Sequence, residues 1–188
     1  QKPQRREISI VFADIRGFTT ISEECAPEFL IEVLNNHLTV AAAAINYQEG
    51  MIDKYDGDTV MALFNSPLNP QDDHAERAVR TAMAIQKDLA EYHRHNPENQ
   101  QLHFGIGVHS GDAVVGNVGS PLRKDYSAVG DAVNLSKRLQ ELAKGGQILI
   151  SQCTYEQVQD LVSVTKLEAV RVKGRKAIDQ IYQLNGIK

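Results

Sequence analysis

The chain contains 188 residues, of which 42% are hydrophobic and 23% charged, and it carries a net charge of −4. This length fits one domain with a sizeable core, and the slight negative charge gives no electrostatic reason to bind nucleic acid. No apolar run approaches the roughly 20 residues that cross a bilayer, and the two distant cysteines argue against a disulfide framework or a zinc site. We expect a cytoplasmic domain, excised from a larger protein that could itself be attached to a membrane.

The first predicted element is a short buried strand over residues 8–13, which are mostly apolar and rich in β-branched side chains. Asp14 follows this strand, Gly17 permits a sharp turn, and helical periodicity extends over residues 26–47. A carboxylate that leaves a strand beside the backbone amides of a helix start suits a metal ion that holds phosphate oxygens.

A β-hairpin is predicted over residues 52–64, with Asp56-Gly57 at its turn. This turn places Lys54 just before it and Asp58 just after it. An isolated Asp-Gly hairpin is usually only a solvated polar turn. Two carboxylates brought together from a strand end and a hairpin would instead match a two-metal phosphoryl-transfer site.

A second helix is predicted over residues 71–93, and His93 and His95 lie at its end beside Arg94. These histidines could be metal ligands. At the end of a helix, however, histidines more often stabilise the negative end of the helix dipole or face water, and we expect this here.

The remaining chain alternates between short strands and helices. Strands are predicted over residues 102–108, 126–129 and 147–151, helices over 131–142 and 154–159, and a final hairpin over 162–172 and 178–184. The order strand–helix–strand–strand–helix–strand in the first part is typical of an α+β fold with a ferredoxin-like core. The glycines form neither a dinucleotide-binding pattern nor a P-loop, so any nucleotide must be bound by another kind of site.

Several motifs in one fixed order carry a resemblance to a known family. They are Asp-Ile-Arg-Gly-Phe-Thr at 14–19, Lys-Tyr-Asp-Gly-Asp at 54–58, Gly-Ile-Gly-Val-His-Ser-Gly at 105–111, Val-Gly-Asn-Val-Gly at 115–119, the stretch 126–138 and Val-Lys-Gly at 172–174. In this order they resemble the catalytic domain of class III nucleotidyl cyclases, from about residue 6 to residue 184. The resemblance implies a palm-like βαββαβ core with an added small α/β subdomain, and one catalytic domain over residues 1–188.

The resemblance implies that Asp14, Ile15 and Asp58 hold two divalent cations, Mg²⁺ or Mn²⁺. Such hard ions prefer oxygen ligands, and few protein ligands suffice when a triphosphate supplies the rest. From the residues alone, Asp14 capping a turn and Asp58 as a surface acid remain the alternative.

The resemblance also implies that Lys54 and Ser127 read the base of the nucleotide. Lysine can donate to adenine N1 and a serine hydroxyl can accept from the N6 amino group, whereas guanylyl cyclases of this family carry glutamate where Lys54 stands. The pair therefore favours ATP. Because a hydroxyl can also donate, Ser127 alone discriminates weakly, and serine here also raises the expectation of a response to bicarbonate.

The remaining site residues are expected to bind the ribose and the phosphates of the nucleotide. Asn134 and Arg138 lie four residues apart on one helix face, where the resemblance implies that they orient the ribose and meet charge on the α-phosphate. An ordinary exposed helix face is the alternative. Backbone amides around Arg16 to Thr19, with Phe18 and Thr19 among them, are expected to hold the β- and γ-phosphates, and the resemblance implies that Lys173 binds the triphosphate.

The predicted reaction converts ATP to 3′,5′-cyclic AMP and pyrophosphate at two sites of a head-to-tail homodimer. The resemblance implies that the two aspartates come from one protomer, and that its partner supplies Lys54, Ser127, Asn134, Arg138 and Lys173. A guanylyl cyclase with relaxed base selection and a non-catalytic nucleotide-binding module are the alternatives.

Overall fold

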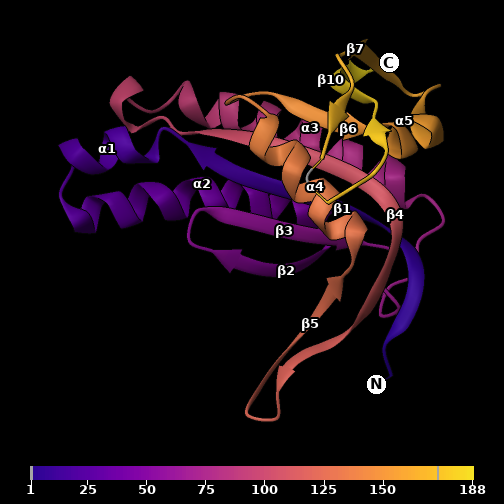
Figure 1. Ribbon diagram of the computed structural model, residues 1–188. Helices are drawn as coiled ribbons and strands as arrows, with labels where there is room; N and C mark the ends of the chain where they lie inside the picture. Colours follow the sequence, from indigo (N-terminus) through magenta and orange to yellow (C-terminus); the bar gives the residue numbers. More distant parts are fainter. Residues whose placement is uncertain (1, 173) are drawn as a thin grey trace.

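The computed structural model describes the backbone of residues 2–172 and 174–188, with side chains at all of these except 54–56 and 99 (Figure 1). One mixed sheet runs through the molecule in the order β2-β3-β1-β4-β6-β10-β7, and β5 pairs with β4 outside this path. The strands near its first edge are β2 (Met51–Asp56), β3 (Thr59–Phe64), β1 (Gln4–Arg16) and β4 (His103–Ser120).

The two faces of β1 separate the core from the site. Its odd-numbered residues Val11, Ala13 and Ile15 belong to the large core cluster, whereas Ile8, Ile10 and Phe12 face the opposite side. Side chains of a strand alternate between faces, so Asp14 and Arg16 follow Phe12 onto that opposite face. The predicted buried strand is thereby confirmed and is longer than expected.

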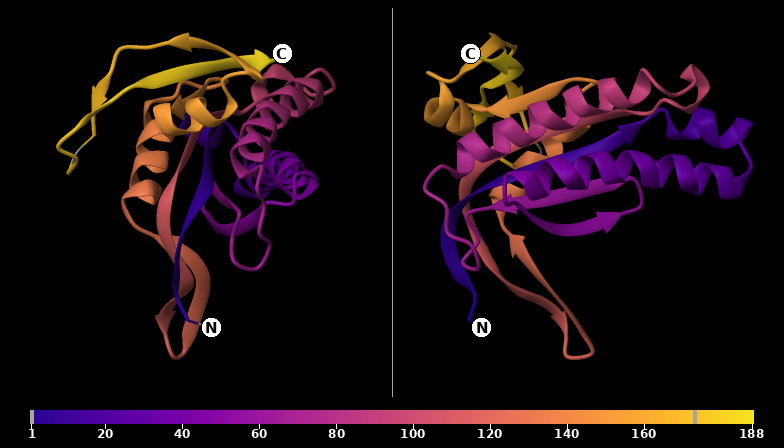
Figure 2. Two further views of the ribbon diagram at one scale, coloured as in Figure 1. Left: turned by 90° about the vertical axis from the view of Figure 1, so that its right-hand side faces the viewer. Right: turned by 180° about the vertical axis from the view of Figure 1, so that it is seen from behind.

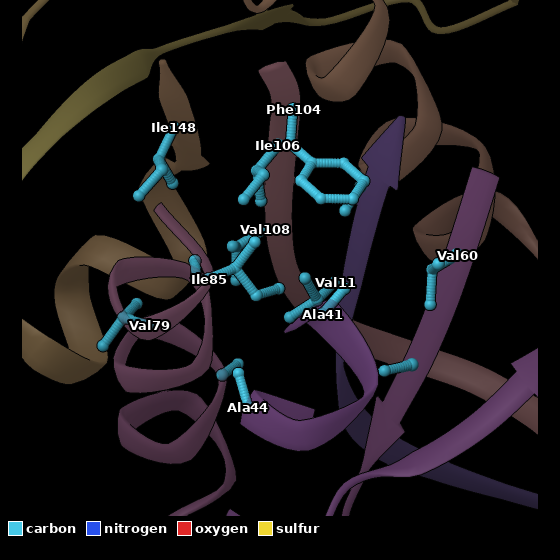
Figure 3. Close-up of a cluster of buried hydrophobic side chains, with 14 of the residues drawn as sticks. Val11, Ala41, Ala44, Val60, Val79, Ile85, Phe104, Ile106, Val108 and Ile148 are labelled. Carbon is cyan, nitrogen blue, oxygen red and sulfur yellow. The ribbon is translucent and has the colours of Figure 1, made fainter. Parts of the chain in front are cut away.

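Two long helices cover the core face of the sheet: α2 (Pro27–Tyr47) and α3 (His74–His93) (Figures 1 and 2). Both match the helical periodicity of the sequence. Figure 3 shows Ile85 of α3 beside Val108 of β4, and Ala44 of α2 and Val79 of α3 belong to the same core cluster. This packing makes the sheet a rigid base for the loops at its ends.

The opposite face carries α4 (Asp131–Leu142), whose bounds are those that the sequence predicts. Gly107 explains how closely this helix approaches β4. A Cβ atom at position 107 would collide with the Gln140 nitrogen and lie 2.5 Å from the carbonyl oxygen of Ser136. Only glycine permits this contact between the main chains of helix and strand.

The first part of the sheet confirms the ferredoxin-like core. In chain order β1, α2, β2, β3, α3 and β4 form βαββαβ, and their strands lie side by side as β2-β3-β1-β4. In the added part, β6 (Ile148–Ser151), β10 (Ile181–Ile187) and β7 (Val162–Lys166) continue the same sheet, and two further short strands form a separate pair. The short helices α1 (Phe18–Glu24) and α5 (Gln152–Val158) and the 3₁₀ turn η1 (Glu98–Gln100) complete the chain.

Three strand predictions are refined by the structure. The strand expected over 102–108 continues to Ser120 and forms a long arm with β5 (Arg123–Val129), which projects from the body in Figure 1. The hairpin turn is Gly57-Asp58, one residue later than expected, because Asp56 still pairs with Thr59 and Gly57 supplies the positive φ of 63°. The final hairpin is interrupted, with β8 (Val170–Arg171) and β9 (Ile178–Asp179) pairing apart from β7 and β10.

The expectation for His93 is wrong, because α3 ends against α2 rather than in water. His93 is only 9% exposed, and its Nε2 lies 3.1 Å from Nε2 of His37. His37 donates from Nδ1 to the Val33 carbonyl, so its Nε2 accepts from the Leu102 amide. Burial, together with His37 and His103, lowers the pKa of His93 to about 4, so the pair is neutral.

His95 does face water, 3.5 Å from Glu91. Among the residues that the structure describes, no group of three or more histidine, cysteine or acidic side chains could hold a metal. None of the helices in the described part of the chain is long and apolar enough to span a membrane.

Candidate active site

Asp14 lies near the end of β1, on the face of the sheet that carries α4. One carboxylate oxygen accepts a hydrogen bond of 2.5 Å from the hydroxyl of Thr59, its cross-strand neighbour on β3. The other accepts from Arg16 Nη1 at 2.7 Å. The side chain is 23% exposed, so the carboxylate is oriented by its neighbours and still accessible.

The structure brings Asp58 to Asp14. Asp58 lies in the hairpin turn beside the end of β1, and its carbonyl oxygen accepts from the Ile15 amide at 3.1 Å. Partial burial and the neighbouring Asp14 carboxylate raise the pKa of Asp58 above its usual value. Two acids held this close repel each other, and a bound cation would relieve that repulsion.

The donors at this place fit a hard divalent cation. Asp14 and Asp58 offer carboxylate oxygens, and Ile15, whose side chain is buried, can offer only its carbonyl. An oxygen-only set with two carboxylates is what Mg²⁺ or Mn²⁺ prefers, and substrate phosphates usually complete its shell. The metal roles of these three residues stay predictions.

The predicted phosphate-binding amides lie directly after β1. Gly17, with φ of 86°, turns the chain into α1, which begins at Phe18. Thr19 is exposed, whereas Phe18 packs partly against the large core cluster and so fixes the start of the helix. The first amides of a helix have no partner within it, so they are available to an anion.

Asn134 and Arg138 share the exposed face of α4, as their spacing predicts. Asn134 lines a pocket of about 230 Å³ between the sheet and α4, together with Phe12, Thr59, Met61, Ala128, Val133 and Lys137. Thr59 therefore connects the Asp14 carboxylate to this pocket. Arg138 is not brought to the aspartates of its own chain and lies 3.9 Å from Glu141, one turn away.

The two predicted base-reading residues come from neighbouring parts of the fold. Ser127 lies on β5 and is 8% exposed, and the next residue, Ala128, lines the pocket. Lys54 pairs with Met61 through its backbone, while its side chain lies outside what the structure describes. Lys173, the predicted triphosphate-binding residue, also lies outside the described residues.

Three residues beside the site are not among those predicted from the sequence. Arg16 bridges Asp14 and the end of α4, since its Nη2 donates to the carbonyl oxygens of Gln140 at 2.6 Å and Ala143 at 3.2 Å. Thr59 binds Asp14, and Asp53 accepts a hydrogen bond of 2.6 Å from Ser127. The i, i+2 spacing of Asp14 and Arg16 in a strand could have indicated the first of these contacts. The other two depend on strand pairings that no local pattern gives.

Comparison with known proteins agrees with this arrangement. The family described as "Adenylate and Guanylate cyclase catalytic domain" matches residues 1–186. Adenylate cyclase 1 of Rhizobium meliloti is 34% identical over 187 residues, which cover 97% of this chain and 28% of that protein. Adenylate cyclase of Anabaena cylindrica is 33% identical over 190 residues, which cover 95% of this chain and 37% of that protein. The chain thus spans well under half the length of these relatives.

Solved structures show the same fold. The adenylyl cyclase CyaB from P. aeruginosa has a TM-score of 0.92 and 34% identity, over 99% of this chain and 97% of that one. The guanylyl cyclase Cya2 also has a TM-score of 0.92, with 37% identity over 100% of this chain and 96% of that one. From the family match, the α+β fold and these relatives, the chain belongs to the adenylate and guanylate cyclase catalytic domain family.

Proposed function

We propose that this domain is an adenylyl cyclase, which converts ATP to 3′,5′-cyclic AMP and pyrophosphate. The observation that carries the proposal is the convergence of Asp14 and Asp58 at one end of the sheet. Burial of Asp58 and the closeness of Asp14 raise the pKa of Asp58, and a perturbed acid beside a second carboxylate supports a cation site. The names of the relatives from Rhizobium and Anabaena support the same reaction.

Asp14, Asp58 and the carbonyl of Ile15 would hold the divalent cations. When bound, Mg²⁺ or Mn²⁺ supplies neutralisation of phosphate charge and a lower pKa for the ribose 3′-hydroxyl. Thr59 and Arg16 each donate a hydrogen bond to the Asp14 carboxylate and so fix its orientation. Its remaining lone pairs are then held in one direction for a cation. This preorganisation lowers the cost of assembling the site.

The residues of α4 act on the nucleotide from the partner protomer. Asn134 orients the ribose, and Arg138 donates paired N–H groups to the α-phosphate as charge grows there. The Arg138 side chain is 45% exposed, and its 3.9 Å contact with Glu141 is a weak surface ion pair. It is therefore free to bind a phosphate across a dimer interface, which supports two shared sites in a head-to-tail homodimer.

Phe18, Thr19 and Lys173 complete the phosphate site in this proposal. The amides at the start of α1 bind the β- and γ-phosphates, and Lys173 adds a positive charge. Lys54 and Ser127 read adenine through N1 and N6.

A guanylyl cyclase is the second candidate, because the structural relative Cya2 carries that name at 37% identity. A non-catalytic module is less favoured, since the aspartates and the Asn134–Arg138 pair are all present. Nothing in the comparisons supports a response to bicarbonate, and we do not propose one.

The test is an assay of the purified domain with Mg-ATP, Mn-ATP and Mn-GTP, followed by mass-spectrometric identification of the cyclic product. We expect cyclic AMP to dominate, and Asp58→Asn to abolish it while Asp160→Asn, at an exposed position elsewhere, does not. A clear preference for GTP would establish the guanylyl cyclase, and no product from a verified dimer would establish the non-catalytic module.

A further inference from the structure

A part-buried hydrogen bond beside the pocket has a consequence for base selection. The hydroxyl of Ser127, on β5, donates to Oδ2 of Asp53, on β2, at 2.6 Å. The two residues are 74 positions apart, and this contact joins the projecting arm to the edge of the sheet. Ser127 is only 8% exposed, so water competes little for its proton.

The local backbone explains how Asp53 reaches Ser127. The pairing of β2 with β3 shifts between Ile52 and Lys54, so Asp53 is the extra residue of a β-bulge. A bulge bends the strand and re-aims the side chain that it carries. Here that side chain reaches the hydroxyl of Ser127 on β5.

The direction of this hydrogen bond is fixed by chemistry. An ionised carboxylate only accepts, and a serine hydroxyl has one proton to give. With that proton held by Asp53, Ser127 presents only lone pairs to any further partner. A group that by itself can donate or accept has thereby become an acceptor.

We infer that Asp53 is a positioning residue that sets the base selection of this domain by locking Ser127 as an acceptor. The inference rests on the proposed function, in which Ser127 meets the base. Adenine presents its N6 amino donor to this acceptor. Guanine would present its O6 acceptor, so two sets of lone pairs would face each other and both groups would stay without a partner.

The expected effect is a change in the ratio of kcat/KM for ATP to kcat/KM for GTP. Asp53→Ala releases the Ser127 proton, which can then turn toward guanine O6. We expect the ATP/GTP ratio to fall by about tenfold, mainly through a lower KM for GTP, because one neutral hydrogen bond is regained. Asp125→Ala, which removes an exposed aspartate from the same strand as Ser127, is the matched control and should leave the ratio unchanged.

A double variant tests whether Asp53 acts on base selection through Ser127 or only through a general loss of stability or activity. In Ser127→Ala protein no hydroxyl remains to be locked, so adding Asp53→Ala should not change the ATP/GTP ratio further. If Asp53→Ala does not fold, Asp53→Val takes its place, because it suits a strand and lacks an acceptor. Equal losses of activity with both nucleotides, at a constant ratio, would overturn the inference.

Binding of non-hydrolysable ATP and GTP analogues by calorimetry provides a readout that does not need turnover. The ratio of their Kd values should shift in Asp53→Ala as the kinetic ratio does. A wild-type domain that prefers GTP or makes no product would refute the proposed function. An ATP-preferring wild type whose ratios do not respond to Asp53→Ala would refute only the role of Asp53.

Discussion

Arg16 donates to the Asp14 carboxylate at 2.7 Å and also binds the end of α4 through the carbonyl oxygens of Gln140 and Ala143. One guanidinium thus joins the strand with a predicted metal ligand to the helix with Asn134 and Arg138. The planar group can bridge several acceptors at once, which a lysine ammonium on its flexible stem does not reproduce. Gly105 leaves room for it, because a Cβ atom there would lie 2.7 Å from Arg16 Nη2.

Arg16→Ala should therefore weaken both stability and activity. It leaves part-buried helix-end carbonyls without their donor, and we expect a loss of about 1–3 kcal/mol in the free energy of unfolding. Urea unfolding measures this loss, and Arg5→Ala, at an exposed position of the same strand, is the control. A stability equal to that of the control would show that the bridge contributes nothing.

Asp58→Asn should abolish cyclase activity while leaving the dimer intact, because the hairpin turn contributes a charge to the site and little to the core. The repulsion that raises the pKa of Asp58 disappears in the variant. We therefore expect the metal-free melting temperature to stay equal or to rise. Cyclic AMP production, size-exclusion chromatography and thermal unfolding test the three parts. A variant that is inactive and also much less stable would contradict this account.

Mixing two inactive variants tests the shared sites. Asp14→Asn removes one half of a site, and Arg138→Ala removes the other half, so a mixed dimer retains one intact site. Random exchange makes half of the dimers mixed, and we expect about a quarter of wild-type activity. Native mass spectrometry should verify the mixed dimers. Verified mixed dimers without activity would rule out sites built from two protomers.

Lys54→Glu combined with Ser127→Cys should shift the preference from ATP toward GTP. A glutamate accepts from guanine N1–H, whereas the lysine donates to adenine N1. A site built for one hydrogen-bonding pattern rejects the other, so we expect at least a tenfold change in the ATP/GTP ratio of kcat/KM. An unchanged ratio would remove Lys54 and Ser127 from the base-reading role.

The buried histidines should make the domain sensitive to acid. The folded state holds the pKa of His93 at about 4 against 6.5 in an exposed histidine, so the unfolded chain binds its proton first as the pH falls. Stability is then full above pH 6.5 and decreases toward pH 4, by about 1 kcal/mol per pH unit or less for this residue. Burial also lowers the pKa of His109 to about 4.

Urea unfolding at several pH values between 7 and 4 measures this decrease. His93→Gln should reduce the dependence on pH, because glutamine can still donate to His37 but does not titrate. His95→Gln, at the exposed end of the same helix, should leave the dependence unchanged. Identical pH dependence in all three proteins would show that the pKa of His93 is the same in the folded and the unfolded chain, contrary to the prediction.

Local patterns in the sequence predict most elements and the motifs of the site. The spacing of Asn134 and Arg138 defines a helix face, and the alternation along β1 places Asp14, so both follow from short-range geometry. The burial of His93 could not be predicted, because it depends on α2 lying across the end of α3. The contact between Asp53 and Ser127 likewise depends on a bulge and on the path of a long arm, and the sequence predicts only the first part of β4, over residues 102–108.

The absence of a single methyl group at position 107 has a further effect. Because α4 rests directly on the peptide groups of β4, no layer of adaptable side chains lies beneath it there to absorb a shift. Close-packed protein interiors have low compressibility, so the helix has little freedom to slide or tilt at this point. The places of Asn134 and Arg138 relative to the sheet are therefore fixed by this contact, and a bulkier residue under the helix would displace both of them together.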